Sequence, residues 1–424
     1  MTLESEEEVL AAEVAPKAPR EASIGMPSNP TLRILAYVLL LSSSPCATLV
    51  FAALAPILPT LAENFGGGTR GPFVAQMMMA MPGLGTIIGG ALSGFLLERL
   101  GLRRVMLGGL AIYVVTGSAG LYLSDMWPLL ISRLLLGLVV ATHSTCVMML
   151  LSEWADGGLR AKLLGYTGAV SGIVSVSAIN LSGALAHADG WRAPFYIYLL
   201  PLVFLLCVAL TVRGNQALVG ASQAKEKGGL TPLIPLYLLI LVLYVAVMMS
   251  AIQVPFLLAA DGVSEPTTRS FMISLGSIGS MSAGMLFGWI FAFLGRKWIV
   301  VLFTGLMSLG FIVAGTVTHI PIVAAACLVF GFGCGMTTPF TGHLILEKAA
   351  PAVRGRAVGL VFVIVSVADF LNPAVIAPIS AQFGIHGAFL IAGVLLAIAS
   401  IVRVFMPTPA ATEPGPATVA ASQH

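Results

Sequence analysis

From residue 94 the chain reads Gly94-Phe95-Leu96-Leu97-Glu98-Arg99-Leu100-Gly101-Leu102-Arg103-Arg104, a short charged segment between two long apolar stretches. From residue 288 it reads Gly288-Trp289-Ile290-Phe291-Ala292-Phe293-Leu294-Gly295-Arg296-Lys297. The two segments share their glycines in one register, 194 residues apart. Apolar residues can recur by chance in a hydrophobic chain, but loop glycines and charges are not expected to recur together. The two segments therefore indicate a duplicated chain.

The composition excludes a water-soluble fold. Of the 424 residues 58% are apolar and only 9% are charged, with a mean hydropathy of +0.99, whereas soluble domains carry about 25% charged residues. Nearly uncharged runs recur along the chain, each long enough to cross a hydrocarbon layer of about 30 Å as a helix. They predict helices over 33–62, 72–98, 104–123, 127–153, 161–186, 193–212, 232–260, 267–292, 298–317, 321–347, 356–381 and 386–406.

The repeat extends in both directions from the two quoted segments. The offset of 194 relates Gly85, Gly137, Glu153, Gly190 and Phe195 to Gly279, Gly331, Glu347, Gly384 and Phe389. Each half holds an even number of crossings, so both halves keep one orientation and are related by an axis along the membrane normal. We expect an all-α integral membrane protein of twelve transmembrane helices, arranged as two pseudo-twofold-related six-helix bundles.

The basic residues predict the topology. With the amino terminus inside, 17 of the 21 Lys and Arg lie in cytoplasmic segments, and an excess of positive charge marks the cytoplasmic side. We expect a multi-pass protein of a cell inner membrane with both termini in the cytoplasm. Its expected parts are a disordered cytoplasmic tail (1–32), an N-terminal bundle (33–212), a cytoplasmic linker (213–231), a C-terminal bundle (232–406) and a second disordered cytoplasmic tail (407–424).

The first quoted segment resembles the major facilitator superfamily signature G-x-x-x-[DE]-R-x-G-x-[RK]-[RK], and with the repeat the resemblance covers residues 33 to 406. The resemblance implies a cytoplasmic latch, in which Glu98 faces a helix amino terminus of the other half and Arg99 pairs with an acid such as Glu153. The alternative is a positive-inside anchor and nothing more. Ala292 and Phe293 replace the acid and the first arginine in the second copy, so we expect a one-sided latch. The predicted gate residues are Gly94, Glu98, Arg99, Gly101, Arg103 and Glu153.

Arg133 begins a segment, Arg133-Leu134-Leu135-Leu136-Gly137, that looks like the R-x-x-x-G pattern of proton-coupled antiporters in that superfamily. A guanidinium within the membrane costs at least about 2.5–3.5 kcal/mol and is normally retained because it pairs or faces water. Its repeat equivalent is Cys327, so the charge is not part of the shared scaffold. We predict a role in the substrate or proton pathway, the alternative being a snorkelling or structural arginine.

Two further ionisable residues lie deep in spans. His143 lies ten residues beyond Arg133 and is either a proton carrier or a hydrogen-bonded packing residue. Asp369 is the one carboxylate well inside a span, about 20 Å along its helix from Arg356. Burial favours a neutral carboxyl, whereas a cation or a water-filled cleft favours the anion, so its protonation should follow the opening of the cleft. The alternative is that Asp369 bonds locally to Asn372.

By resemblance, the first, fourth, seventh and tenth helices line a central cavity. This adds Gln253, Thr337 and Thr338 to the predicted pathway, with packing of small residues as the alternative. His343 and Glu347 have the i,i+4 spacing of metal ligands, but two ligands do not make a site and no metal is expected. The five cysteines form no CxxC pair, which predicts neither a disulfide framework nor a zinc site.

These features predict a secondary active transporter that moves a small organic solute by alternating access, by proton-coupled efflux. The Gly-Pro pair of the antiporter signature is missing from Gly168-Ala169-Val170-Ser171-Gly172, so the alternative is a proton-coupled importer of a small organic anion bound by Arg133. The sequence contains no GxSxG, HExxH or nucleotide-binding loop, so we expect neither an enzyme nor a cofactor. The expected partners are a small-molecule substrate, protons and membrane lipid, but no nucleic acid, and the protein should be monomeric.

Overall fold

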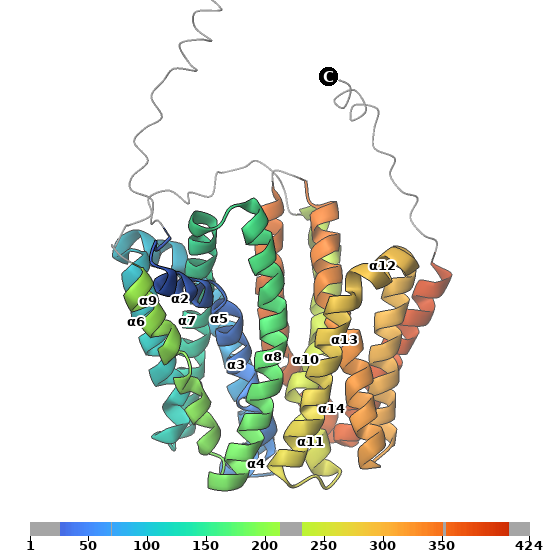
Figure 1. The fold of residues 1–424 in the computed structure, drawn as a ribbon. Helices are drawn as coiled ribbons and strands as arrows, with labels where there is room; N and C mark the ends of the chain where they lie inside the picture. The colour runs from blue at the N-terminus through green and yellow to red at the C-terminus, as the bar shows by residue number, and fades with distance from the viewer. Residues whose placement is uncertain (1–25, 69, 213–230, 351–352, 407–424) are drawn as a thin grey trace, which may run out of the picture.

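The computed structural model describes residues 26–68, 70–212, 231–350 and 353–406, and every regular element in those ranges is helical. Two bundles stand side by side, the N-terminal half and the C-terminal half (Figure 1). The N-terminal half contains α2 Pro30–Leu40, α3 Ser43–Ala52, η1 Ala55–Ile57, α4 Leu58–Asn64, α5 Arg70–Leu100, α6 Leu102–Gly117, η2 Ser118–Leu121, α7 Met126–Trp154, α8 Gly157–Asp189, η3 Ala193–Leu199 and α9 Leu202–Thr211. The C-terminal half contains η4 Thr231–Leu233, α10 Ile234–Ile252, α11 Val254–Ala260, α12 Pro266–Thr316, α13 Ile320–Lys348 and α14 Arg354–Phe405.

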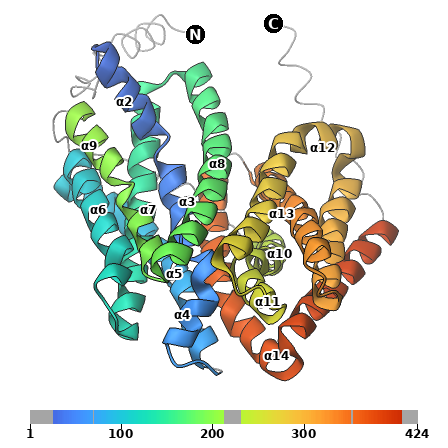
Figure 2. The same ribbon diagram turned by 60° about the horizontal axis from the view of Figure 1, so that its bottom comes forward.

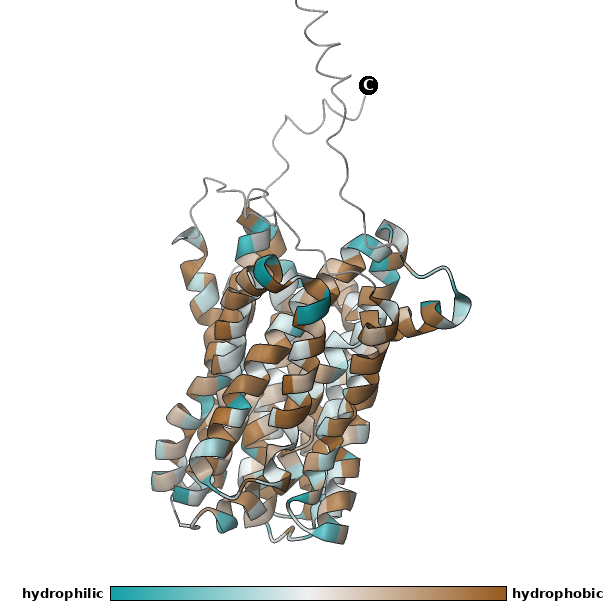
Figure 3. Ribbon diagram, turned by 90° about the vertical axis from the view of Figure 1, so that its left-hand side faces the viewer, coloured by the Kyte–Doolittle hydropathy of each residue, from teal (hydrophilic) through white to brown (hydrophobic). Residues whose placement is uncertain are grey.

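These elements make the predicted number of crossings. In the described ranges, ten helices are long and apolar enough to span a membrane. Two of them, α12 and α14, have 51 and 52 residues and each joins two helices across a break, at Gly295 and Gly384. The described segments therefore cross twelve times. Apolar residues run along the helices, while hydrophilic segments gather at the two ends (Figure 3).

The repeat is present in the backbone. Gly101 and Gly295 have φ of 77° and 71°, and Gly190 and Gly384 have φ of 78° and 74°. A positive φ is costly for any residue with a Cβ atom, so each pair marks one tight turn that only glycine makes easily. The predicted two-bundle fold is confirmed, and the 194-residue offset relates equivalent turns.

The close helix contacts repeat as well. A Cβ atom on Gly85 would lie 2.0 Å from the carbonyl oxygen of Leu134, and one on Gly279 would lie 2.4 Å from that of Leu328. These are equivalent positions, because 194 residues separate the members of each pair. Glycine thus brings the second helix of each half against the fourth.

Some expected boundaries shift. The first helix begins at Pro30, capped by the Asn29 side chain, which accepts a hydrogen bond from the Thr31 amide; the helix therefore begins before the predicted residue 33. Residues 1–25 and 407–424 of the predicted tails and 213–230 of the linker lie outside the described ranges.

The two halves touch at mid-depth and at one end of the molecule. We call the end with Thr211 and Thr231, which flank the linker, the linker end, and the opposite one the far end. Figure 2 shows the far end, where α4 and α5 face α11 and α14. There a Cβ atom on Gly183 of α8 would lie 2.1 Å from the Ser270 hydroxyl oxygen of α12. At Gly165, nearer the linker end of α8, nothing lies within 4 Å of that position. The space between the halves is therefore closed at the far end.

Candidate functional site

A cavity of about 900 Å³ lies between the halves. Helices α3, α8, α10, α12, α13 and α14 line it, so both halves contribute. Its surface is mainly apolar and contains few polar side chains. The polar residues of the described lining are Thr48, Ser171, Ser175, Ser250, Ser277, Ser280, Thr338 and Asp369.

Asp369 lies where the lining meets the contact between the halves. The residue is 6% exposed, and its Oδ1 has no hydrogen-bond partner among the described atoms. A Cβ atom on Gly83 of α5 would lie 3.1 Å from Asp369 Cβ and 2.8 Å from the Ser366 carbonyl oxygen. The absence of a side chain at Gly83 thus lets α5 pack directly on the turn of α14 that carries the carboxyl group.

Asn372 does not bond to Asp369, contrary to the alternative considered from the sequence. Its Oδ1 accepts from Gln253 Nε2 at 2.9 Å, and its Nδ2 donates to the Val245 carbonyl oxygen at 2.9 Å. Gln253 Oε1 in turn accepts from Gln76 Nε2 of the N-terminal half at 3.1 Å. These three amides, Gln76, Gln253 and Asn372, form a neutral chain across the two halves, outside the described cavity lining.

Arg133 is placed inside the N-terminal half and does not belong to the cavity lining. Its side chain is fully buried, and Nη2 donates to the Gly117 carbonyl oxygen at 2.7 Å. The guanidinium carbon lies 5.1 Å from the ring centroid of Phe195 and 4.8 Å from that of Tyr198. A backbone carbonyl and two aromatic faces stabilise the cation, so this geometry favours the structural alternative for Arg133.

His143 and Thr337 occupy equivalent positions in the two halves, and neither lines the cavity. His143 Nε2 lies 2.8 Å from Ser42 Oγ, whose single hydrogen is donated to the Leu39 carbonyl oxygen. The imidazole therefore donates from Nε2, and Nδ1 has no partner among the described atoms. Thr338, the next residue after Thr337, does line the cavity and accepts from the Tyr244 hydroxyl at 3.0 Å.

The predicted pair between Arg99 and Glu153 is not formed in this conformation. Both side chains are exposed, and Arg99 lies over the ring of Phe95, 4.6 Å from its centroid. Gly94 and Glu98 are also exposed, and Arg103 Nη2 donates to the Ala209 carbonyl oxygen at 3.3 Å.

The second copy of the segment does carry an ion pair, although we expected the latch in the first copy alone. Arg296 Nη1 lies 2.7 Å from Glu347 Oε1, and His343 lies 3.9 Å from the other oxygen of that carboxylate. In the described ranges no three His, Cys, Asp or Glu side chains gather as metal ligands. His343 and Glu347 therefore belong to a surface cluster with Arg296.

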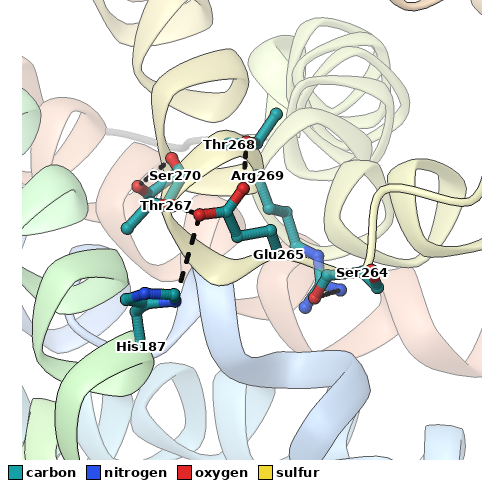
Figure 4. Close-up of polar contacts among 7 residues, drawn as sticks. All are labelled: His187, Ser264, Glu265, Thr267, Thr268, Arg269 and Ser270. Carbon is teal, nitrogen blue, oxygen red and sulfur yellow. Dashed lines mark hydrogen bonds and ion pairs between the residues drawn. The ribbon is translucent and has the colours of Figure 1, made fainter.

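A contact at the far end closes the cavity, and the sequence reasoning missed it. Arg269 of α12 is 3% exposed, and its guanidinium donates to the Pro56 carbonyl oxygen of the N-terminal half at 3.0 Å. It also donates to the carbonyl oxygens of Val263 and Ser264 of its own half. Figure 4 shows the Arg269 side chain beside Ser264. A signal was available, because Arg269 is one of only three basic residues that the predicted topology leaves on the outer side.

Beside it, Glu265 connects the start of α12 to α8. Its carboxylate accepts from the hydroxyls of Thr267 and Thr268 at 2.6 and 3.0 Å, and it lies 3.9 Å from His187 (Figure 4). The two hydroxyl hydrogen bonds lower the pKa of Glu265, so the carboxylate stays ionised under mildly acidic conditions. Glu265 is exposed, so water and salt weaken its attraction to His187.

We expect Arg269→Ala to open the far end. The substitution removes the hydrogen bond that Arg269 donates across the halves, to Pro56; such a bond from a charged donor is typically worth about 1.5–3 kcal/mol, so the closed population should fall roughly tenfold or more. Pulsed spin-label distances between Asp125→Cys and His319→Cys, exposed far-end positions of the two halves, should lengthen. Arg192→Ala is the matched control, because within the described part of the chain Arg192 donates to Gly120, Leu123 and Ser124, all of its own half. We call the Arg269 hydrogen bond to Pro56 the Arg269 clamp. Unchanged distances in Arg269→Ala would show that this clamp does not hold the far end closed.

Comparisons with known proteins agree with this architecture. A family model described as Major Facilitator Superfamily matches residues 40–261 and 236–423. The arabinose-proton symporter of Escherichia coli (strain K12) is 26% identical over 158 residues, which cover 37% of this chain and 33% of that protein. The multidrug efflux pump Tap of Mycolicibacterium fortuitum is 25% identical over 148 residues, covering 34% and 35%. The chain thus aligns with about a third of the length of these curated relatives.

The fold likeness extends much further than these sequence alignments. The crystal structure of a D-xylose-proton symporter has a TM-score of 0.71 at 16% identity, over 88% of this chain and 98% of that one. At such identity the likeness shows the fold alone. The family model covers nearly all the described helices, and on that ground the chain belongs to the major facilitator superfamily.

Proposed function

We propose that this protein is a secondary transporter that exports a small organic solute in exchange for protons. Asp369 carries the proposal: it is a buried carboxyl that lines the cavity, has no hydrogen-bond partner at Oδ1 among the described residues and touches Gly83 of the other half. Protonation of Asp369 changes the charge of the cavity and, at the same time, the charge at the contact between the halves. A proton can therefore bias the exchange between the two conformations.

The charge of the cavity favours this proposal over uptake of an organic anion. That alternative needs a cation facing the substrate, and Arg133 was its candidate. Arg133 instead bonds to the Gly117 carbonyl oxygen inside one bundle. Asp369 would repel a carboxylate whenever it is ionised.

The proposed topology places the linker end in the cytoplasm, so the closed far end faces outward in this conformation. The predicted latch of Glu98, Arg99 and Glu153 lies at the linker end. In this proposal it forms only when that end closes, which accounts for the absence of the Arg99 and Glu153 pair here.

We expect Arg99→Ala to slow transport severalfold at normal expression and insertion, because loss of the latch biases the protein toward the conformation described here. Initial transport rates in proteoliposomes, normalised to the amount of protein, would measure the effect. Arg33→Ala, which removes an exposed arginine at the same end, is the control. A normal rate in Arg99→Ala would contradict the gating role.

The sign of proton movement tests the proposed exchange. Purified protein is reconstituted into liposomes that contain the pH indicator pyranine, and L-arabinose, sialic acid or ethidium is added outside. In exchange, solute entry drives protons out and the interior becomes alkaline, whatever the orientation of the protein. In symport the interior becomes acidic. Acidification with any of these solutes would contradict export and indicate proton-coupled uptake. Solute movement without a pH change would show that transport is not coupled to protons.

A further inference from the structure

The described cavity lining carries one carboxylate and no basic side chain. Its other titratable groups are the thiols of Cys327 and Cys334 on α13, and Tyr244 of α10 lies behind Thr338. The charged residues of the helices that pack around Asp369 lie near helix ends or beside the break at Gly295: Arg70, Glu98 and Arg99 on α5, Arg160, Lys162, His187 and Asp189 on α8, Arg269, Arg296 and Lys297 on α12, and His343, Glu347 and Lys348 on α13. An ionised Asp369 therefore has no protein cation beside it in the lining.

Most hydroxyls of the described lining already have a hydrogen-bond partner. Thr48 bonds to Ser171 at 2.7 Å, and Ser175 bonds to Ser277 at 3.1 Å. Thr338 accepts from Tyr244, and the Ser250 hydroxyl donates to the Val247 carbonyl oxygen. The amide side chains Gln76, Gln253 and Asn372 bond among themselves outside the lining. A sugar, whose hydroxyls each need a partner when buried, would find few free donors or acceptors here.

The rest of the lining suits an apolar and polarisable ligand. It presents the aromatic ring of Phe51 and the thioethers of Met248, Met281 and Met285, whereas Phe330 is 1% exposed and packs on Phe311. Aromatic faces attract organic cations, and flexible methionines adapt to ligands of different shape. A cavity of about 900 Å³ is in the size range that accommodates a drug-sized molecule.

We infer that the cavity takes a lipophilic organic monocation whose charge is balanced by the Asp369 carboxylate. When the carboxyl is protonated, the cation displaces that proton: the O–H bond of the acid breaks, the proton leaves to water, and the cation pairs with the carboxylate. One positive charge thus replaces another, and proton and substrate compete for one group. This inference rests on the proposed proton exchange and names its substrate class.

Two ions of nearly the same size and shape but opposite charge provide the test. Equilibrium dialysis of the purified, detergent-solubilised protein would compare tetraphenylphosphonium with tetraphenylborate, with empty micelles subtracted. We expect the cation to bind at least tenfold more tightly than the anion. In weak buffer at a pH where the carboxyl is protonated, cation binding should release close to one proton per molecule bound. D-xylose should not displace the cation.

Asp369→Asn should weaken tetraphenylphosphonium binding at least tenfold and abolish the proton release. Asp189→Asn, which neutralises an exposed carboxylate at the end of α8, should bind like the parent protein. Equal binding of the two ions, or displacement by D-xylose, would overturn the substrate class. If the cation fails to bind while another solute still drives proton exchange through Asp369, the substrate class is wrong and the proposed function stands. If the cation binds without releasing a proton and moves across liposomes without a pH change, the proposed coupling is wrong.

Discussion

Asp369→Asn should abolish solute accumulation driven by a pH gradient, while solute exchange at equal pH persists at solute concentrations high enough to offset the weaker binding expected of this variant. For a transporter that exchanges one proton per solute, a gradient of one pH unit supplies about 1.4 kcal/mol and supports about tenfold accumulation. The variant should reach no more than equal concentrations on the two sides. Proteoliposomes with an imposed gradient, loaded with a solute identified in the pyranine assay, would measure both quantities.

The chemistry of the amide explains why gradient-driven accumulation should be lost while exchange at equal pH is retained. Asparagine preserves the shape of a protonated aspartate and its contact with Gly83, but it neither binds nor releases a proton. The two halves should therefore still move between their conformations, but a pH gradient should no longer change the relative populations of those conformations. Asp189→Asn again serves as the control. Gradient-driven accumulation in Asp369→Asn would show that Asp369 is not the proton carrier. His143 would then be the next candidate, tested as His143→Gln.

Arg133→Ala should destabilise the protein strongly, and Arg133→Lys should be almost as harmful. Truncation of a large buried side chain typically costs about 3–5 kcal/mol, and here it also leaves the Gly117 carbonyl oxygen without its donor. Lysine keeps a charge but not the planar group that lies against Phe195 and Tyr198. Thermal unfolding in detergent would show the losses. A lysine variant as stable and active as the parent would mean that a simple positive charge suffices.

The repeat shows what replaces the arginine in the other half. Where the N-terminal half has Gly117, Arg133 and Tyr198, the C-terminal half has Phe311, Cys327 and Ala392, and the Phe311 ring packs on Phe389 there. If Arg133→Cys is stable enough to purify but transports nothing, Arg133 has a role in transport beyond packing.

The number of helices and the repeat could be predicted because they depend on length and composition. A run such as 72–98 is expected to span the membrane as a helix, since a helix satisfies the backbone hydrogen bonds of the segment within the segment itself; the structure has Arg70–Leu100. The turns were predictable too, because Gly101 and Gly295 stand in one register and a positive φ favours glycine.

The site was less predictable, because the sequence gives the depth of a residue but not the direction of its side chain. The residues of α7 are apolar on every face of the helix, so no polar stripe in its sequence shows which way Arg133 and His143 point. Asp369 was identified by depth alone, and its contact with Gly83 depends on how the halves pack. The Arg269 clamp belongs to one of two conformations, and a sequence does not say which one is populated.

The close approach at Gly83 has a mechanical consequence. If the halves rotate about this contact, α5 is a lever with arms of about 17 residues to Leu100 and 13 to Arg70, or roughly 25 and 20 Å. A rotation of about 15°, the size of known rigid-body subunit rotations, would displace the two tips by roughly 7 and 5 Å. The arms are nearly equal, so the two mouths of the molecule would open by similar amounts. A side chain at position 83 would act as a wedge at the fulcrum and slow the rocking without touching either mouth.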